Sequence, residues 1–483
     1  MIREEKRIVP TGAKQEKNFR DQLTTVSDEG KRKWIYPKKP SGRFYNARNI
    51  VSIFLLGVLI GTPFIKLKGH PFVLFDIINR NFIFFGIPFG PHDFFLLVLA
   101  TIAAIVFIIL FTAVFGRVFC GWACPQTIFM EMVFRKIEYW IEGDSRNQKK
   151  LNSAPWNRSK IFKKVLKHVI FFGISFFIAN VFLAYIISLD ELIVIVTDPP
   201  SQHLQGLVVI TIFSLVFYWI FSSFREQVCT VVCPYGRLQG VLLDKDSIVV
   251  AYDHVRGDPR GPIRKNKNQT NLGDCIDCHL CVDVCPTGID IRDGIQLECV
   301  NCTACIDECD MVMEKISRPR GLIRYASMNS IEKKSRFRFT PRAIGYTILL
   351  TALTGVLSYL LITRTNLNVN IFRTPGLLYQ EQPDDKISNI YDLNIVNKSF
   401  DRAHIKLKLD NVEGELKIIG KELIIEPQQI ADVKFLIIMP LSVIKKMNTP
   451  IDISVYNGET FVKTIRTSLL GPVKKRSSDE TET

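Results

Sequence analysis

Three features of this 483-residue sequence predict its fold class. Four long uncharged stretches and a fifth, shorter one indicate about five transmembrane helices. Two runs of four closely spaced cysteines indicate an inserted ferredoxin-like α+β domain. Short segments that alternate apolar and polar residues near the C-terminus indicate an immunoglobulin-like β-sandwich. The sequence therefore predicts an α-helical membrane protein with one inserted domain and one C-terminal β-sandwich.

The uncharged stretches are each about as long as a helix that crosses a bilayer, which needs about 20 apolar residues. The fifth stretch, Ile50–Ile65, is shorter and ends at Lys66, but the amine of a lysine at a helix end can reach the lipid headgroups. One such stretch could be a buried helix of a soluble protein, but five in one chain make that explanation poor. The four long stretches are Phe94–Phe115, Val169–Leu189, Leu207–Phe224 and Ala343–Thr363.

The distribution of Lys and Arg predicts how these spans are oriented. Residues 1–49 contain 13, residues 116–166 contain 10 and residues 225–342 contain 18, whereas residues 66–93 contain three and residues 189–206 none. Because cytoplasmic loops are enriched in Lys and Arg, we expect the N-terminus in the cytoplasm and the C-terminus outside it. The net charge of +15 follows mostly from this asymmetry, so no nucleic-acid partner is required to explain it.

All twelve cysteines lie in segments that this orientation places in the cytoplasm or at its edge. Thiolates that bind metal must be reduced, and the cytoplasm keeps them reduced. Two independent signals thus predict a multi-pass protein of a bacterial inner (cytoplasmic) membrane, with the N-terminus and the inserted domain in the cytoplasm. Membrane lipid is an expected partner, and the sequence leaves a homodimer open.

Eight of the cysteines follow the bacterial ferredoxin spacing, used twice. Three cysteines separated by two residues can wrap around three corners of a [4Fe–4S] cube, and the fourth corner is supplied by the other run. The spacing therefore predicts two [4Fe–4S] clusters. Cluster A is assigned to Cys275, Cys278, Cys281 and Cys309, and cluster B to Cys299, Cys302, Cys305 and Cys285.

Zinc and disulfides explain this pattern poorly. Zinc sites usually pair one Cys-x2-Cys with a distant second pair, and a disulfide framework requires an oxidising compartment. Asp310 stands where a proline would usually follow the last cysteine, and we expect it to affect the surroundings of cluster B. His279, inside the first run, is interpreted either as a donor to sulfur that tunes the cluster potential or as a solvent-facing loop residue.

The predicted domain boundaries combine the spans with these motifs. The C-terminal region contains strand-like runs at Tyr391–Val396, His404–Leu409, Glu415–Ile419, Val433–Ile438 and Ile451–Tyr456. We expect a basic cytoplasmic segment at 1–49, followed by transmembrane helices 1–4 at 50–224 with a cytoplasmic loop at 116–166. A cytoplasmic region is expected at 225–342, with the two-cluster ferredoxin domain at about 265–315. Helix 5 at 343–363, an extracytoplasmic immunoglobulin-like domain at 364–473 and a disordered tail at 474–483 complete the chain.

The remaining four cysteines form a second repeated motif, Cys-x3-Cys-Pro. Cys120 and Cys124 follow the second span, and Cys229 and Cys233 follow the fourth; we call these four residues the membrane-edge cysteines. If the helices continue past the lipid, residues four apart share a face, so each pair presents two thiols side by side until the proline ends the helix. The two pairs could then meet as one four-thiolate site.

Such a site has three functional interpretations: a soft-metal site suited to Cu(I), a redox-active dithiol, or the ligands of a further iron–sulfur centre. The alternative is that these cysteines are small packing residues at helix ends. Repetition of the motif at matching membrane depth favours a functional site, and spacing does not decide among the three. Basic residues near the motifs are predicted to anchor helix ends to anionic lipid: Arg117, Arg135, Lys136, Arg225 and Arg237.

The combination of these features resembles the FixG/CcoG family of membrane polyferredoxins, which are accessory proteins of cbb(3)-type cytochrome c oxidase. The resemblance rests on the five spans, the double ferredoxin motif, the C-terminal β-domain and three segments: Arg117-Val-Phe-Cys120-Gly-Trp-Ala-Cys124-Pro-Gln-Thr, Cys233-Pro-Tyr-Gly-Arg237 and Tyr252-Asp-His-Val-Arg-Gly-Asp-Pro-Arg-Gly261. It implies reduction of Cu(II) to Cu(I) in the cytoplasm, with copper-export and oxidase-assembly proteins as partners. The membrane-edge cysteines would bind or reduce copper as catalytic residues, and the ferredoxin cysteines would supply the electron.

Three hypotheses remain from the sequence. The first is a cupric reductase, which predicts dependence on the membrane-edge cysteines and no quinol site. The second is a quinol-linked electron-transfer subunit that feeds an extracytoplasmic reductase, although the external domain has no cysteine to carry electrons onward. The third is a redox-sensing assembly scaffold. No nucleotide-binding or covalent haem motif occurs, so the electron donor is an unidentified partner or quinol.

Overall fold

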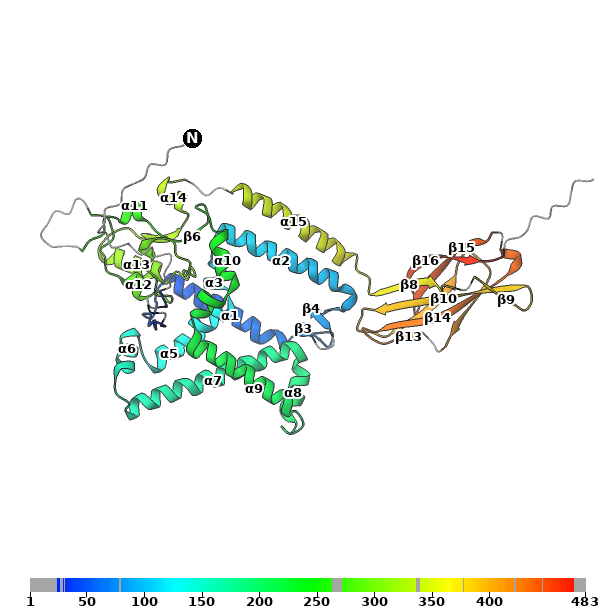
Figure 1. Cartoon of the computed structure of the whole chain (residues 1–483), viewed down its shortest axis with the longest axis horizontal. Coiled ribbons are helices and arrows are strands. Elements are labelled where there is room, and N and C mark those ends of the chain that lie inside the picture. The colour runs from blue at the N-terminus through cyan, green and yellow to red at the C-terminus, as the bar shows by residue number, and fades with distance from the viewer. Residues whose placement is uncertain are drawn as a thin grey trace, which may run out of the picture. The chain divides into compact units, whose positions relative to one another are not determined.

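The structure is a computed structural model of the chain (Figure 1). It describes residues 24–26, 29, 31–77, 80–262, 272–335, 339–376, 378–420, 423–444 and 446–472. The predicted tail at 474–483, the first 23 residues of the basic segment and the predicted start of the ferredoxin domain at 265 lie outside the described residues. The chain divides into two compact units, Met1–Ile65 with Leu99–Gly355, and Lys66–Val98 with Val356–Thr483.

Five helices of the described residues are long and apolar enough to cross a membrane, as predicted. Helix α2 has the predicted bounds, whereas α7 begins earlier, at Arg158, because the side chain of Asn157 caps it by accepting a hydrogen bond from Lys160 N. Helix α9 continues as a π-helical turn, η5 (Ile220–Phe224). The helices are α1 (Arg43–Gly61), α2 (Phe94–Phe115), α7 (Arg158–Ile187), α9 (Leu204–Trp219) and α15 (Pro341–Ile362).

Shorter helices connect these spans within the first unit. A buried aromatic cluster holds several of them together: the ring of Phe134 stacks on Phe221 with 4.7 Å between centroids and packs edge-on against Phe171 at 4.8 Å. The short elements are α3 (Val118–Trp122), α4 (Pro125–Thr127), the π-helix η4 (Ile128–Phe134), α5 (Arg135–Ile141), α6 (Ser145–Ser153), α8 (Leu189–Thr197), the π-helix η6 (Val228–Val232) and α10 (Pro234–Leu242).

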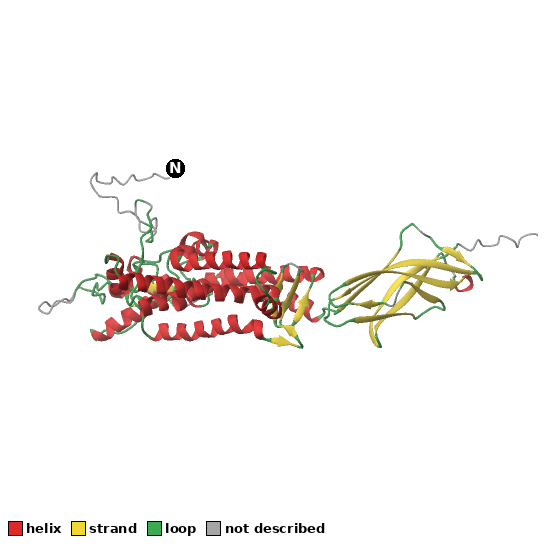
Figure 2. Ribbon diagram, turned by 90° about the horizontal axis from the view of Figure 1, so that it is seen from below, coloured by secondary structure: helices red, strands yellow, loops and turns green. Residues whose placement is uncertain are grey.

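The ferredoxin region has a core of its own, wider than the predicted 265–315. Strand β6 (Val249–Tyr252) pairs antiparallel with β7 (Ile323–Ala326), and residues of both strands pack against the cysteine-bearing segments. The region also contains α11 (His254–Gly257), α12 (Leu280–Asp283), the 3₁₀ turn η7 (Ile291–Asp293), α13 (Ala304–Lys315) and α14 (Met328–Glu332). Figure 2 shows short strands among helices here.

The second unit contains the predicted immunoglobulin-like β-sandwich. One sheet has the order β12-β14-β10-β8, with β9 paired to β10, and the other has the order β13-β11-β15-β16. Alternating apolar residues fill the space between the sheets, as in Ile395, Ile437 and Ile453, which are fully buried. The strands are β8 (Leu367–Arg373), β9 (Gln380–Gln382), β10 (Lys386–Asn397), β11 (Ala403–Leu409), β12 (Glu415–Ile419), β13 (Ile424–Ile425), β14 (Ile430–Pro440), β15 (Asn448–Asn457) and β16 (Thr460–Leu470).

A small β-meander after the first span also belongs to the second unit, and the sequence did not predict it. Its ring contact with the sandwich is a stack of His70 on Phe400, with 3.7 Å between centroids. Just before α2, the buried carboxylate of Asp93 lies 2.8 Å from Arg364 Nη2 and 2.6 Å from Lys398 Nζ. The strands are β1 (Lys66–Leu67), β2 (His70–Pro71), β3 (Val73–Asp76), β4 (Asn81–Phe84) and β5 (Ile87–Phe89).

We predict that Asp93→Asn destabilises the second unit by about 3–5 kcal/mol, because the substitution leaves two cations buried without their common partner. Pulse proteolysis of the detergent-solubilised protein in urea measures this. Glu426→Gln is the control: Glu426 pairs with Arg402 on the surface, and the two side chains are 46% and 67% exposed. Loss of that pair should cost about 0–1 kcal/mol. Equal effects of the two substitutions would contradict the prediction.

Candidate functional site

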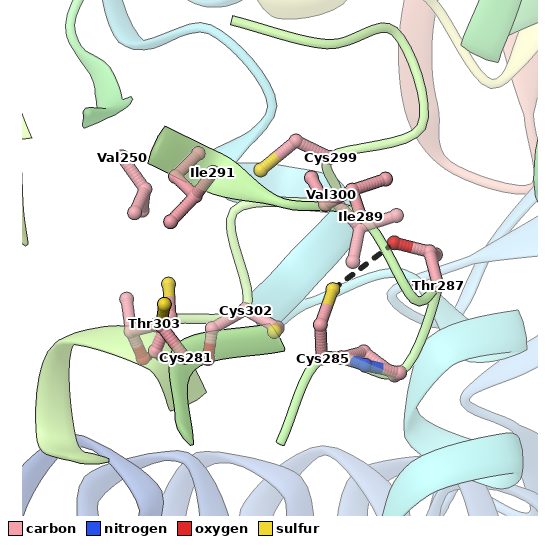
Figure 3. Close-up of a pocket in the computed structure, with 12 residues that line it drawn as sticks. Val250, Cys281, Cys285, Thr287, Ile289, Ile291, Cys299, Val300, Cys302 and Thr303 are labelled. Atoms are coloured by element: carbon pink, nitrogen blue, oxygen red, sulfur yellow. Dashed lines mark hydrogen bonds between the residues drawn. The ribbon is translucent and has the colours of Figure 1, made fainter. Parts of the chain in front are cut away.

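The eight ferredoxin cysteines line two cavities that share Cys281. Cavity A is lined by Cys275, Cys278, Cys281 and Cys309. Cavity B, drawn in Figure 3, is lined by Cys285, Cys299, Cys302 and Cys305, with Cys281 at its edge. Each cavity therefore receives three cysteines from one run and one from the other, which is the arrangement that the crossed ferredoxin pattern predicts.

The two cysteine loops repeat the same backbone conformation. In the first loop Asp277 and His279 have φ of 57° and 58°, and in the second loop Asn301 and Thr303 have φ of 54° and 66°. In each loop these two residues lie directly before and directly after the second cysteine of the run, so the repeats match position for position. Successive residues that alternate between right- and left-handed conformations turn their N–H groups into a concavity that binds anions, as at many iron–sulfur sites.

Burial makes the thiols of these cavities weak acids in the absence of a cation. It raises the pKa of Cys281, Cys299 and Cys309 to about 12 and that of Cys302 to about 11. A buried thiolate requires a positive partner in contact with it, and iron is such a partner. A set of four thiols, a concave backbone and an otherwise apolar lining therefore fits a [4Fe–4S] cluster in each cavity.

The sequence singled out two side chains near the cavities. The His279 ring is 58% exposed and lies 2.8 Å from Arg292 Nη2 and 3.4 Å from Asp277 Oδ1, which agrees with the alternative of a solvent-facing loop residue. Asp310 accepts a hydrogen bond from Gly321 N at 2.8 Å. Because Asp310 follows Cys309, which lines cavity A, the prediction that it affects the surroundings of cluster B was wrong.

The segments that carry the membrane-edge cysteines are structural repeats of one another. Both begin at a residue with positive φ four positions before the first cysteine, Gly116 at 56° and Arg225 at 50°. In both, the second cysteine has an extended backbone and its N–H donates to the carbonyl oxygen five residues earlier, at 2.9 Å for Cys124 and 2.7 Å for Cys233. A new helix then starts at the proline.

The spans therefore do not continue as helices through the cysteine pairs, so the condition under which each pair would share one helix face is not met. Helix α2 ends at Phe115 and α9 gives way to η5, and in each repeat the chain turns before the first cysteine. Glycine adopts a positive φ at no steric cost, whereas Arg225 does so at a cost of about 1–3 kcal/mol. The guanidinium of Arg225 is fixed by two hydrogen bonds to the buried Glu138, at 2.9 and 3.2 Å, and these hold the turn.

The structure does bring the two cysteine pairs together. Burial, and then the proximity of Cys124, Cys120 and Cys233, raises the pKa of Cys229 to about 12. Burial likewise raises the pKa of Cys120 to about 11, although the buried amide of Gln239 lies 3.4 Å from its sulfur. In the described part of the chain, no three His, Cys, Asp or Glu side chains are grouped as ligands of one metal ion.

The first of these repeats packs directly on the second ferredoxin loop. A Cβ added at Gly121 would lie 2.6 Å from Val300 O, so the two backbones touch. The buried side chain of Arg48 donates from Nε to Gly121 O and from Nη1 to Cys302 O, each at 3.0 Å. The backbone contact at Gly121 and the hydrogen bonds of Arg48 therefore join the membrane-edge site to cavity B.

The prediction that the nearby arginines anchor lipid was also wrong for three of them. Arg117 is buried and donates to the carbonyl oxygens of Leu297 and Gly236, which links the first repeat to the ferredoxin loop and to the second repeat. Arg135 is buried beside Glu131 at 3.0 Å, and Arg225 is buried on Glu138. These cations therefore pair with protein groups. Lys136 is half-buried and donates to Asn49 Oδ1 at 2.6 Å.

Comparison with protein families identifies three matching segments. Residues 224–328 match a 4Fe-4S dicluster domain, residues 97–146 match a 4Fe-4S binding domain, and residues 357–472 match the IG-like fold at the C-terminal of FixG. The match of residues 97–146 contains Cys120 and Cys124 of the membrane-edge set. Among the three interpretations of that set, it favours iron–sulfur ligation.

Relatives resemble the chain over most of its length. Protein RdxA of Cereibacter sphaeroides is 35% identical, over 79% of this chain and 83% of its own. Nitrogen fixation protein FixG of Rhizobium meliloti is 32% identical, over 85% of this chain and 87% of its own. The crystal structure of a FixG-related protein from Vibrio parahaemolyticus is 14% identical, with a TM-score of 0.19, and covers 22% of this chain and 97% of that chain.

The cavities predict which cysteine substitutions affect the same cluster. Cys285→Ser should give the same altered cluster signal as Cys299→Ser, because both thiols line cavity B although they come from different runs. Cys278→Ser should alter the other signal. Iron analysis and electron paramagnetic resonance of the dithionite-reduced protein measure this. If Cys285→Ser altered the same cluster signal as Cys278→Ser, the crossed assignment of the cysteines would be contradicted.

The contact at Gly121 predicts a second effect. Gly121→Ala should separate the first repeat from the ferredoxin loop, since neither backbone can yield as a flexible side chain would. We expect electron transfer to an added acceptor to slow at least tenfold, which corresponds to about 1.4 kcal/mol. Gly173→Ala on α7 is the control, because nothing lies within 4 Å of its added Cβ. Stopped-flow reoxidation of the reduced protein compares them, and equal rates would contradict the prediction.

Proposed function

Because the chain belongs to the FixG family of membrane iron–sulfur proteins, we propose that it reduces Cu(II) to Cu(I) for assembly of a cbb(3)-type cytochrome c oxidase. That the protein is a membrane iron–sulfur electron-transfer protein follows from its relatives and its 4Fe-4S domains. Copper reduction at the membrane-edge cysteines is the step that we add.

The observation that carries the proposal is the contact between the membrane-edge site and cavity B. Reduction of Cu(II) to Cu(I) consumes one electron, and thiolates are the ligands that Cu(I) prefers. The eight ferredoxin cysteines would hold clusters, which would supply electrons singly. The backbone contact of Gly121 with Val300, and the hydrogen bonds of Arg48, keep the copper-binding thiols at a fixed position next to the ferredoxin loop.

Each group of residues then has a role. The membrane-edge cysteines bind Cu(II), favour Cu(I) as the product and release it to a copper-export or oxidase-assembly protein. Cys275, Cys278, Cys281 and Cys309 hold cluster A, and Cys299, Cys302, Cys305 and Cys285 hold cluster B. Arg117 contributes by fixing both repeats, since it bonds to Leu297 on the ferredoxin side and to Gly236 beyond the second cysteine pair.

The proposed location is the inner membrane of a bacterium, with the ferredoxin region in the cytoplasm and the immunoglobulin-like domain outside it. The Lys and Arg asymmetry and the restriction of cysteine to the cytoplasmic segments support this orientation. Copper in the cytoplasm then reaches the thiols directly, and export follows reduction.

A second candidate is an electron relay in which the membrane-edge cysteines hold a third iron–sulfur centre. The match of residues 97–146 to a 4Fe-4S binding domain favours it, because this segment contributes Cys120 and Cys124. The two candidates differ in iron content. A third [4Fe–4S] centre adds about four irons per chain beyond those of the ferredoxin region.

Anaerobic Cu(II) reduction by the dithionite-reduced protein tests the proposal. The variant with Cys120, Cys124, Cys229 and Cys233 all changed to Ser should lose Cu(I) formation, measured with a Cu(I) chelator after removal of dithionite. It should retain the visible absorbance of the ferredoxin clusters. Equal rates in the variant and the parent would mean that the clusters reduce copper adventitiously, and a loss of about four irons would favour the relay.

A further inference from the structure

A groove between α7 and α9 has the composition of a site for an amphipathic aromatic molecule. It has a volume of about 660 Å³ and is lined by Trp156, Lys164, His168, Phe172 and Tyr218, together with aliphatic side chains of α7. Pockets of 300–1,000 Å³ with an apolar lining and a few polar groups are typical ligand sites. We propose that this groove binds a quinol and is the point at which electrons enter the protein.

The position of the groove suits a lipid-soluble ligand. Helices α7 and α9 lie side by side (Figure 1), and both are membrane spans. The groove lies where the basic first turns of α7 give way to the uncharged run that begins at Val169. This is the depth at which lysine and aromatic side chains mark a membrane interface. A quinone diffusing in the bilayer can therefore place its ring in the groove and leave its tail among the lipids.

The polar group in the groove is a hydrogen-bonded pair. Tyr218 OH lies 2.8 Å from His168 Nδ1, and the two rings are perpendicular, with 6.0 Å between centroids. Phe172 packs edge-on against Tyr218 at 6.1 Å. Since Tyr218 engages Nδ1, the ring nitrogen that remains for a ligand is Nε2. In the tautomer whose Nδ1–H donates to the Tyr218 oxygen, Nε2 is an acceptor, so a quinol hydroxyl can donate to it while the quinol ring packs against the aromatic side chains.

Trp156 forms the outer wall of the groove and is 74% exposed. Lys160 Nζ lies over its ring, 4.9 Å from the centroid, and donates to the carbonyl oxygens of Asn152 and Ala154 at 2.9 and 2.6 Å. The lysine thus fixes the indole although the indole itself is accessible. A planar ring can stack on such a surface without reordering the protein.

The charge of the groove favours a neutral quinol over an anionic lipid headgroup. The cation that lines the groove, Lys164, pairs with the buried carboxylate of Glu142 at 2.9 Å. Lys167, one turn of helix away from the rim, pairs with the same carboxylate at 2.9 Å. An anionic phosphate would have to break these pairs to gain a cation, whereas a quinol hydroxyl needs only an acceptor and a nearby base.

A chain of buried ion pairs leads from the groove to the second cysteine repeat. From Glu142 the pairs run through Lys167 to Glu138 at 3.6 Å and on to Arg225 at 2.9 Å. Arg225 lies 3.7 Å from Glu226, which also pairs with the partly exposed Arg32 at 3.2 Å. The carbonyl oxygen of Glu226 accepts a hydrogen bond from Cys229 N at 3.1 Å. The groove is therefore connected both to the protein surface and to the membrane-edge site.

The proposal rests on the proposed function, in which iron–sulfur clusters accept single electrons. Oxidation of the hydroquinone breaks two O–H bonds and releases two protons and two electrons. The two protons pass in turn to Nε2 of His168, which lines the groove, and leave from it to water. The two electrons go, one at a time, to two one-electron acceptors held by the ferredoxin cysteines, and the quinone returns to the bilayer.

Quinone binding is tested by tryptophan fluorescence. Decylubiquinone titrated into the detergent-solubilised holoprotein should quench Trp156, and Trp156→Phe should remove most of that quenching. His168→Phe should weaken binding about tenfold or more, since it removes the hydrogen-bond acceptor. His203→Phe is the matched control, because His203 pairs with Asp198 away from the groove. Unchanged quenching in His168→Phe would overturn the proposal. Loss of quenching in the presence of phosphatidylglycerol vesicles, at the same lipid concentration in all variants, would also overturn it.

Electron entry is tested on the same proteins. Decylubiquinol should bleach the cluster absorbance of the parent and of His203→Phe, and this bleaching should slow about tenfold in His168→Phe. Tyr218→Phe, which keeps the ring, should raise the KM for decylubiquinol more than it lowers kcat. Dithionite-driven Cu(II) reduction should stay unchanged in His168→Phe. Failure of copper reduction in every protein would count against the proposed function alone, whereas equal quinol rates in His168→Phe and the parent would overturn the quinol site.

Discussion

The close contact between Gly121 and the backbone of Val300 and Asn301 is the constraint on which the rest of the first unit depends. There is no room for a side chain at this point, so the first cysteine repeat and the second ferredoxin loop can approach only through glycine. Arg48 then bonds to both partners, with oxygens of Gly121 and Cys302 each 3.0 Å from its nitrogens. A membrane span is thereby attached to an iron–sulfur domain through hydrogen bonds that water cannot replace, because the arginine is buried.

Much of this organisation could be predicted from the sequence because it depends on local patterns. Cysteine spacing is read within one loop, apolar length within one helix, and alternation within one strand, so the cysteine-lined cavities, the spans and the sandwich were expected where the structure has them. The burial of Arg135 and Arg225 was not predictable in this way. Glu138, the partner of Arg225, is distant in sequence, as is Glu226, which lies 3.9 Å from Arg135, and an isolated basic residue beside a span has the pattern of a lipid anchor.

The backbone turns before the cysteines were likewise not predictable from local sequence patterns. Gly116 is a residue that permits positive φ, but Arg225 occupies the matching position in the second repeat, where no residue preference predicts a turn. A tertiary interaction, the paired hydrogen bonds to Glu138, imposes the conformation instead. The groove at His168 and Tyr218 was missed for a related reason: the two residues are fifty positions apart and meet only when α7 and α9 pack.

The two repeats share a backbone conformation but differ in charge, and the charge determines which part of the protein each repeat contacts. Three residues before the first cysteine, one repeat has Arg117 and the other has Glu226. Arg117 donates to the carbonyl oxygen of Leu297 in the ferredoxin loop and to that of Gly236, whereas Glu226 joins the ion pairs that begin at the groove. A buried cation requires acceptors and a buried anion requires cations, so exchanging the two would leave both unpaired. The first repeat is thus fixed to the ferredoxin loop through Arg117, and the second is fixed to the ion pairs of the helical region through Glu226.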